Sequence, residues 1–566
     1  MTNSKSLLLL ILLLLFFGML LYAENNQKTF DSDSLEYSLI RDLTIEQGLG
    51  APSSASPWST DELLKMLHRI DPAKLSPDSF SNYTWVEERL RTNTDSSVFR
   101  DFNFAVGIQA VGEMYLHTNT SRFFDEDEEW VQDYTSRAPL LSIPFEFWGT
   151  ENIYGTIDLT LRNNRFYTET KSSAGFFKPT LSTNLIFDDN PSNTDLSFPW
   201  NAYISFGDQN WNMQFGRDTA SWGNGSTGNM VIGNHMDYHE FLRFTTYYDP
   251  FKYTFLTISF PHPDFLENPE NPISSVRTFI GHRFEFLFFE KLRLSLSEGI
   301  MYQGDTYDFR FFSPFVILHN YYMRGNSNSI LSIEIDYSLL PSLFVHGQLG
   351  IDDFALGIES STSSSAQPNA WGALAGLHYT KSINQGMLHI LLEGAYTTPY
   401  FYLRDSGVSS DPAAPIDFIV GYQQYTQLTG LLVDKDFLGF KYGGDAVILN
   451  LSASYTKQDL WDLYGSMFWM MHGTYDIDTP YGTGPTSASA QTPTTQNYSE
   501  DYPTDKNAVE FSVISSVGGD YSISQNLRVN ASLDWILKWN AGNLLSLNPA
   551  GDSDLQCTVG FSYTVQ

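Results

Sequence analysis

Cysteine and basic residues are scarce in this 566-residue sequence. The single cysteine, Cys557, has no partner for an intrachain disulfide and cannot build a cysteine-based zinc site. Lysine and arginine number 32 against 65 acidic residues, which gives a formal net charge of −33. Binding to nucleic acid requires clustered cations that neutralise phosphates, so this balance excludes nucleic acid as an expected partner. Acidic loops are instead expected at a cell surface.

Long apolar runs are also missing after residue 23. No later segment reaches the roughly 18 apolar residues that a transmembrane helix needs. The chain nevertheless contains 42 Phe, 32 Tyr and 12 Trp, with a mean hydropathy of −0.23. Many aromatic residues without long apolar runs are typical of alternating strands that turn one face toward lipid. The composition therefore predicts a membrane barrel rather than several soluble domains.

Recognisable catalytic motifs are absent as well. The sequence has no HExxH, no P-loop and no GxSxG elbow, so we expect no enzyme and no cofactor. A surface hydrolase built from scattered Ser, His and acidic residues stays open as an alternative. The acidic run 125–129 lacks the spaced Asp/Gly pattern of a calcium loop. We therefore expect a solvated loop there rather than a cation site, and no metal elsewhere.

The N-terminal 23 residues predict export. Lys5 precedes an apolar run from Leu7 to Leu21, and small Ala23 stands before acidic Glu24. This run is short for a membrane span, and its order of charged, apolar and small residues is typical of a signal peptide. A retained N-terminal anchor is the alternative. The expected location is the cell outer membrane.

Residues 24–98 predict a polar leader to residue 34 and then a small domain of three short helices. Leucines recur every four residues from Leu35 to Leu43, which places them on one face of the first helix. A capping box of Ser59 and Glu62 begins the second, which stops before Pro72. The third follows Pro77, and its apolar face comprises Phe80, Tyr83, Val86 and Leu90. Helices this short persist only when they pack on one another or on a scaffold.

From Phe102 onward the hydrophobic period changes from 3.6 to 2, and the alternation recurs to the C-terminus. Long and short connections also alternate, as they do in membrane barrels with long outer loops and short periplasmic turns. The long connections are 111–138, 162–198, 218–238, 261–278 and 301–328, and the short ones are 149–152, 207–210, 248–250, 289–291 and 339–342.

The strand count depends on one choice. If residues 397–444 form a single outer segment, the count reaches 18, and an even count returns the C-terminus to the periplasm. The Ser/Thr/Pro-rich stretch 479–505 then lies outside the cell. The expected fold is an all-β transmembrane barrel of about 18 antiparallel strands over residues 99–566, with a small N-terminal α-helical periplasmic domain.

The most distinctive outer loop, residues 215–230, reads FGRDTASWGNGSTGNM. Its glycines let the backbone turn sharply and approach a ligand, and Trp222 offers a flat apolar face that can stack on a sugar ring. We take Arg217, Asp218, Trp222 and Asn224 as candidate polysaccharide contacts. The alternative is that the glycines serve loop geometry alone and Trp222 belongs to the aromatic girdle of the barrel.

Charged residues alternate with apolar ones farther along the chain. Arg283 and Glu285 alternate with His282 and three phenylalanines, and Arg293 occupies an equivalent position in the next strand. Charges on the face away from lipid must point into the lumen, where they can pair across strands. We favour a ladder that braces the barrel over a ligand site. Glu298 interrupts the alternation and predicts a bulge near Gly299.

The order of several motifs resembles that of the Wzi-type capsule-assembly outer-membrane proteins. DLTIEQGLG (42–50) followed by PWS (57–59) is similar to the helical domain of that family, and FGRDTASWGNG resembles its GR…WGPG segment, with Asn224 where the family usually has Pro. Further motifs in the family's order are GHRFEF (281–286), LSLSEG (294–299), FFSPF (311–315), IDD (351–353) and LGFKYGGDA (438–446).

This resemblance implies an 18-stranded barrel, a helical bundle at the periplasmic mouth and outer loops that hold capsular polysaccharide. We therefore expect a non-enzymatic, lectin-like protein in surface glycan assembly. Its expected partners are surface polysaccharide, outer-membrane lipid and the barrel-assembly machinery, and it is expected to be a monomer. A general, cation-preferring pore and an outer-membrane hydrolase are the alternatives.

Overall fold

The fold was analysed in a computed structural model. The described residues are 25–91, 97–99, 102–118, 136–149, 151–163, 181–186, 194–195, 201–260, 276–314, 327–353, 370–403, 416–427, 430–477, 509–543 and 551–565. The expected signal peptide, the acidic run 125–129 and the stretch 479–505 lie outside them.

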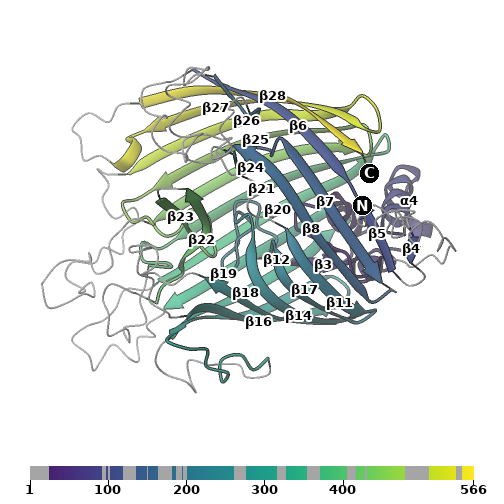
Figure 1. Ribbon diagram of the computed structural model, residues 1–566, viewed down its shortest axis with the longest axis horizontal. Helices are drawn as coiled ribbons and strands as arrows, with labels where there is room; N and C mark the ends of the chain where they lie inside the picture. The colour runs from purple at the N-terminus through teal and green to yellow at the C-terminus, as the bar shows by residue number, and fades with distance from the viewer. Residues whose placement is uncertain are drawn as a thin grey trace, which may run out of the picture.

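A closed barrel of 18 antiparallel strands dominates the described part of the chain (Figure 1). Its first strand is divided at Gly107 into β5 (Phe102–Val106) and β6 (Ile108–His117), and β28 pairs with β6 to close the ring. The other strands are β7 (Leu141–Gly149), β8 (Ile153–Asn163), β11 (Ala202–Asp208), β12 (Trp211–Asp218), β14 (His239–Tyr248), β15 (Phe251–Phe260), β16 (Val276–Phe288), β17 (Leu292–Gly304), β18 (Ser327–Leu340), β19 (Leu343–Asp353), β20 (Ala370–Ile383), β21 (Gly386–Thr397), β24 (Ala446–Lys457), β25 (Trp461–His472), β26 (Glu510–Ser522), β27 (Leu527–Trp539) and β28 (Gly551–Val565). The predicted fold class is confirmed.

Short elements accompany the barrel. The pairs β1 (Thr29–Phe30) with β3 (Trp58–Ser59), and β2 (Ala55–Ser56) with β13 (Ser221–Trp222), form two small sheets apart from the wall. The remaining short elements are β4 (Ser97–Phe99), β9 (Leu181–Thr183), β10 (Thr194–Asp195), β22 (Ile419–Gln427), β23 (Gly430–Phe437), η1 (Pro72–Lys74) and η4 (Ala541–Asn543).

The connections follow the predicted rhythm. Strands β22 and β23 pair with each other and not with the wall, so residues 397–444 add no barrel strand, as the count of 18 required. Two predictions need correction. Strand β6 continues to His117, although the alternation placed a loop from residue 111. The predicted bulge near Gly299 is wrong, because β16, β17 and β18 stay in continuous register through this position.

The outward face of the wall is apolar, as contact with lipid requires. In the last strand Val559, Phe561, Tyr563 and Val565 are each 44–55% exposed, while the alternate positions hold Gly, Ser and Thr. Strand β24 shows the same pattern at Leu449 and Leu451. None of the described helices is both long enough and apolar enough to cross a membrane.

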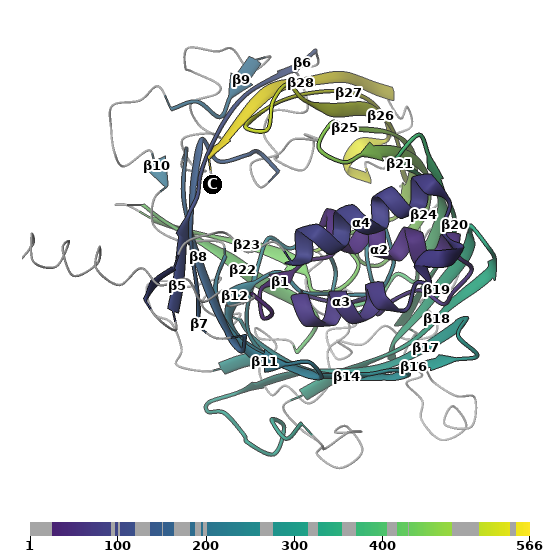
Figure 2. The same cartoon turned by 90° about the vertical axis from the view of Figure 1, so that its right-hand side faces the viewer.

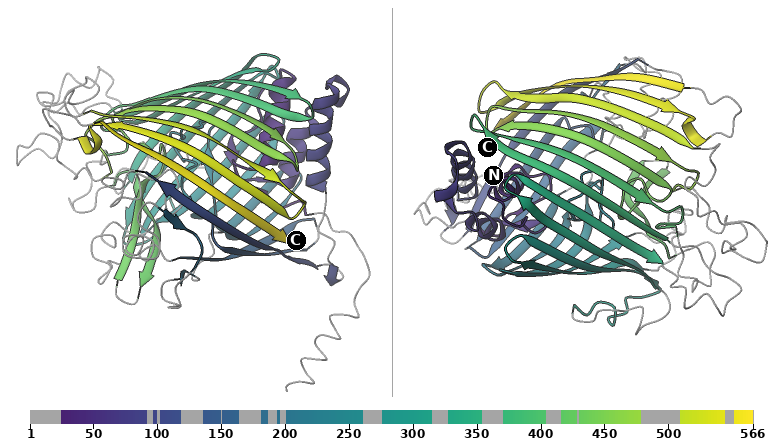
Figure 3. Two further views of the ribbon diagram at one scale, coloured as in Figure 1. Left: turned by 90° about the horizontal axis from the view of Figure 1, so that it is seen from above. Right: turned by 180° about the vertical axis from the view of Figure 1, so that it is seen from behind.

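Three helices lie at the end of the barrel that carries the short turns, the periplasmic end (Figures 2 and 3). They are α2 (Leu35–Glu46), α3 (Thr60–His68) and α4 (Pro77–Arg91), and they share one buried core that includes Leu39, Leu43, Leu63, Val86 and Leu90. In α4 the predicted face is only partly right, since Phe80 is 49% exposed. The helices contact β19, β20 and β21, so they lie to one side of the mouth.

The polar leader is more than a connection. Thr29 is buried inside the barrel, where its hydroxyl donates to Asp218 at 3.2 Å and its backbone N–H donates to Tyr203 at 3.3 Å. Gln27 is also buried and receives a hydrogen bond from Asn212 at 3.0 Å. The leader therefore docks on the inner face of β11 and β12.

The cap of α3 joins the helical domain to the wall. The Ser59 hydroxyl accepts from the Glu62 N–H at 3.3 Å, as the capping box predicted, and it also contacts the Tyr247 hydroxyl at 3.1 Å. Glu62 does not complete the box, because its carboxylate pairs with Lys252 of β15 at 2.6 Å.

Substituting Ser59→Ala is expected to destabilise α3 by roughly 1 kcal/mol, the usual value of an N-cap hydrogen bond. Faster hydrogen–deuterium exchange at the first amides of α3 would measure this loss. Ser32→Ala is the matched control, because Ser32 lies outside the helix and its hydroxyl donates to its neighbour Asp33. Unchanged exchange in the Ser59 variant would contradict the capping role.

Candidate functional site

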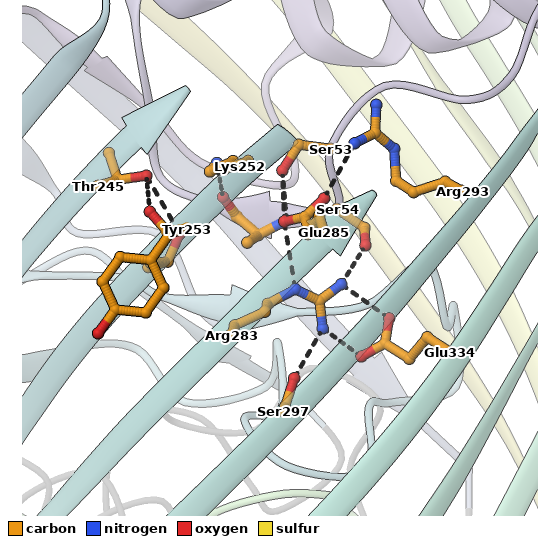
Figure 4. A network of polar contacts seen from close by, with 12 residues as sticks. Ser53, Ser54, Thr245, Lys252, Tyr253, Arg283, Glu285, Arg293, Ser297 and Glu334 are labelled. Atoms are coloured by element: carbon orange, nitrogen blue, oxygen red, sulfur yellow. Dashed lines mark hydrogen bonds and ion pairs between the residues drawn. The ribbon is translucent and has the colours of Figure 1, made fainter. Parts of the chain in front are cut away.

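A buried ion-pair network occupies the inner wall where the sequence predicted a charge ladder (Figure 4). Arg283 pairs with Glu334 on β18, at 2.9 Å to one carboxylate oxygen, and with Glu285 at 3.2 Å. Arg293 pairs with Glu285 at 3.4 Å. The Arg283 and Glu285 side chains have no exposed surface. The structure therefore brings Arg283, Glu285 and Arg293 together inside the lumen.

The network also binds the inserted segment, which we define as residues 49–59 between α2 and α3. Arg283 donates to the Ser54 hydroxyl at 2.8 Å, and the Ser53 hydroxyl donates to Glu285 at 2.8 Å. Both serines are buried. Figure 4 shows these two serines between the wall residues and the helices. The ladder thus braces the barrel and holds a second part of the chain.

Three wall cations donate to backbone carbonyls of the inserted segment. Arg293 donates to the Ala51 carbonyl at 3.0 Å, Lys252 to the Ala55 carbonyl at 3.0 Å, and Arg243 to the Pro57 carbonyl. A segment with so little regular structure leaves carbonyls without backbone partners, and burying them unbonded is costly. The wall supplies these partners, so an irregular strand can cross the barrel interior.

The candidate outer loop enters the lumen from the other end. Strand β13 pairs with β2 of the inserted segment, with Ser221 opposite Ser56 and Trp222 opposite Ala55. Gly223 and Gly228 adopt φ angles of +131° and +140°, which side chains rarely tolerate. The glycines therefore serve loop geometry, and the loop packs against the N-terminal domain inside the barrel.

Trp222 is fully buried in this contact. Its ring lies against Gly281, where an added Cβ would be 2.6 Å from the ring. The Arg283 guanidinium lies 6.0 Å from the ring centroid. With no exposed surface, Trp222 does not offer a face for a sugar, so that expectation does not fit its position. It belongs to the lumen core and not to an outward aromatic girdle.

The other three candidate residues have different positions. Asn224 is buried and donates to Asp336 at 3.0 Å, while Asp218 is buried and accepts from Gln214 and from Asn201 at 3.0 Å. Arg217 lies at the outer rim, paired with Glu240 and stacked 4.1 Å from the centroid of the Tyr238 ring. The Arg217 side chain keeps 13% of its surface exposed, so it is the one of the four candidates that is not classed as buried.

An aromatic core at the outer end was not predicted from the sequence. Phe401, Tyr402 and Phe440 have no exposed surface and pack with Met230 of the Trp222 loop. The Tyr402 hydroxyl donates to the Met230 carbonyl at 2.7 Å and accepts from the Phe440 N–H at 2.8 Å. In the sequence, the aromatic run at residues 400–402 was the signal that could have predicted this core. This outer core joins the Trp222 loop to residues 397–444.

A row of histidines on β19, β20 and β21 was also missed. Hydrogen bonds connect Glu393 to His346 (3.0 Å), His346 to His378 (2.7 Å) and His378 to His389 (2.9 Å). Glu393 also accepts the Thr227 N–H at 2.7 Å, so it holds the Trp222 loop. Both nitrogens of His346 are used without a serine, so this row does not resemble a hydrolase triad. Within the described residues, no group of three or more potential ligands is placed to bind a metal.

The lumen is filled unevenly in the described part of the chain. Inward residues of β14–β18 such as Arg243, Thr254 and Glu334 are buried, whereas inward Asp462, Ser516 and Asp520 of β25 and β26 remain partly exposed. A cavity of about 40 Å³ lies beside α3, lined by Lys65, Arg69 and the turn between β14 and β15. It has room for a few water molecules but not for a sugar.

Comparison with known families agrees with this architecture. Residues 150–457, more than half of the chain, match the family model of the capsule assembly protein Wzi. The chain belongs to the Wzi capsule-assembly family. No curated protein matches it. Family membership places this barrel in the outer membrane.

The solved structure of Wzi shows the same fold. Wzi of Escherichia coli, an outer-membrane protein involved in group 1 capsule assembly and a carbohydrate-binding β-barrel, aligns with a TM-score of 0.55 at 15% identity, covering 94% of this chain and 98% of Wzi. OprD of Pseudomonas aeruginosa aligns at 0.39 and 6% identity, covering 82% and 94% of the two chains. OmpT of Vibrio cholerae aligns at 0.32 and 9% identity, covering 84% and 99%.

Substituting Arg283→Met is expected to release the inserted segment, because Glu285 and Glu334 would lose their shared buried cation. Breaking a buried pair from one side costs about 3–5 kcal/mol. Urea unfolding in detergent and protease cleavage within residues 49–59 measure this effect. Arg310→Met is the matched control, since Arg310 is 75% exposed and pairs with Asp308 in its own loop. Equal stability of the two variants would contradict the role of the network.

Proposed function

We propose that this protein binds surface polysaccharide at its extracellular side and takes part in capsule assembly without catalysing a reaction. Membership of the Wzi family supports the assembly role, and the carbohydrate binding of Wzi supports the ligand class. The structural observation that carries the proposal is the contact between the inserted segment and the Trp222 loop inside the barrel. It holds the outer loop from within, so the outer surface is presented on a fixed support.

The two alternatives fit the described residues less well. A wide-open pore conflicts with two chain segments that meet inside the lumen. The sequence contains no recognisable hydrolase motif. The histidine row bonds to Glu393 and to other histidines rather than to a serine hydroxyl. Polysaccharide binding at the cell surface needs neither an open lumen nor a nucleophile.

The four candidate residues take two roles in this proposal. Arg217 contacts the glycan at the rim together with its neighbours Glu240 and Tyr238, because it is the candidate that keeps some exposed surface. Asp218, Trp222 and Asn224 act through the position of the loop, because they are buried in contacts with the leader, the inserted segment and β18.

The proposal includes four further points. The protein is exported by a cleaved signal peptide and inserted by the barrel-assembly machinery, and it contacts outer-membrane lipid as a monomer. The period-two strands with their apolar outward faces support the lipid contact and the assembly route. The apolar run before Glu24 supports the export route.

Substituting Arg217→Ala is expected to reduce the polysaccharide retained on cells several-fold, with a matching rise in the culture medium. Binding of the purified protein to the polysaccharide of the same cells, measured on an immobilised surface, should weaken in parallel. Lys74→Ala is the control, because Lys74 is an exposed cation of the periplasmic helical domain. Normal retention and binding in the correctly assembled Arg217 variant would remove this residue from the site. Failure of the unmodified protein to bind would overturn the proposed function.

A further inference from the structure

Strands β15, β16 and β17 carry two separate apolar cores, one on each side of the wall. Phe279 faces the lumen and packs in the core that contains Trp222, whereas its neighbour Ile280 belongs to a different cluster. The second cluster comprises Tyr253, Phe255, Ile280, Ile300, Tyr302 and Phe311, all buried. Ile280 of β16 and Ile300 and Tyr302 of β17 share the parity of Phe288 and Leu296, which are each 41% exposed on the outside. Tyr253 and Phe255 of β15 stand opposite Phe284 and His282, which have the same parity. The second core therefore lies on the outward face.

Residues 304–314, which follow β17, cover this outward core, and we call them the cover segment. The segment runs outside the ring of strands, in teal, in Figures 1 and 2. The Phe311 and Tyr302 rings lie 4.8 Å apart, and the Tyr302 hydroxyl donates to the Thr306 carbonyl at 2.8 Å. The Tyr253 hydroxyl donates to the Pro314 carbonyl. These contacts hold the segment against the wall at both ends.

Polar side chains lie beneath the cover segment on the same outward face. His282 and Glu298 stand opposite each other in the register of β16 and β17, and they are 0% and 8% exposed. The Tyr253 hydroxyl lies 2.9 Å from Nδ1 of His282. Exposing such groups to hydrocarbon is unfavourable, so an uncovered wall would be poorly suited to lipid here. The Tyr253 hydroxyl lies between this patch and the cover segment, because it contacts both His282 and the Pro314 carbonyl.

The exterior of the cover segment is aromatic. Tyr307 and Phe309 are 49% and 84% exposed, and both rings contact Phe312, with centroids 5.5 and 6.4 Å away. Beside them Arg310 donates to Asp308 at 3.0 Å in an exposed ion pair. Aromatic rings next to satisfied charges suit the boundary between lipid headgroups and acyl chains.

We propose that the cover segment is a membrane-interface anchor that shields the polar patch at His282 and Glu298 and inserts Phe309 into the outer leaflet. Lipid is the occupant that fits, because the segment lies on the same face of the wall as Phe288 and Leu296 in the apolar band. This role is independent of polysaccharide binding. It also explains why a histidine and a glutamate interrupt the outward apolar pattern of β16 and β17.

A spin label at position 309 tests the anchor. In a Cys557→Ser background, Phe309→Cys would be labelled with a nitroxide and the full chain reconstituted in phospholipid vesicles. Collision rates with oxygen, which concentrates in lipid, and with a water-soluble nickel complex report the environment of the label. Leu296→Cys on the outward wall is the lipid control, and Lys74→Cys in the helical domain is the water control.

The anchor predicts an oxygen-to-nickel ratio at position 309 near that of position 296 and several-fold above that of position 74. A ratio equal to that of position 74 would place the segment in water and overturn the proposal. Low collision rates with both reagents, together with spin–spin broadening, would indicate a second copy of the chain and would also overturn it. Because Phe309 is highly exposed, the label is not expected to impair folding, which heat-dependent gel mobility checks.

Discussion

The structure depends on wall cations that donate to the carbonyls of the inserted segment. In a closed barrel the backbone groups of each strand bond to the neighbouring strands. An irregular segment inside the barrel has no such neighbours, so its buried N–H and C=O groups need other partners. Arg243, Lys252 and Arg293 supply the missing donors, and Glu62 and Glu285 balance part of their charge. Buried charges of this kind are tolerated only when each is paired and hydrogen-bonded, so the wall and the segment require each other.

This mutual requirement extends to the extracellular end. The inserted segment pairs with β13, and the loop that follows β13 packs on the aromatic core around Tyr402. Glu393 then connects the same loop to the histidine row on β19–β21, the strands that the helices contact. Contacts between residues thus run without a break from the helical domain at the periplasmic end to the Trp222 loop at the extracellular end. Such a connection suits a protein that binds a polymer outside the cell.

The sequence predicted the barrel and the helices well because both obey strong local rules. Lipid on one face of the wall enforces a period of two, and the Ser59 cap and the apolar faces define α2 and α3. The Trp222 loop could not be placed this way. A glycine-rich loop can fold inward or outward, and here it folds inward onto β2, where Ser56 contacts Ser221, 165 residues later in the chain. Glu298 suggested a bulge for a related reason: the pattern did not reveal that this outward-facing position is buried.

The most direct test of this account is a disulfide between the inserted segment and the outer loop. Ser56 and Ser221 are register partners, and their hydroxyl oxygens lie 3.2 Å apart. Ser56→Cys with Ser221→Cys, in a Cys557→Ser background, should form a crosslink in intact outer membranes, detected by mobility after protease cleavage between the two positions. Ser524→Cys with Ser221→Cys is the control that should stay reduced, because Ser524 lies in the exposed turn between β26 and β27. Absence of the first crosslink in a correctly folded barrel would contradict the meeting of the two segments inside the lumen.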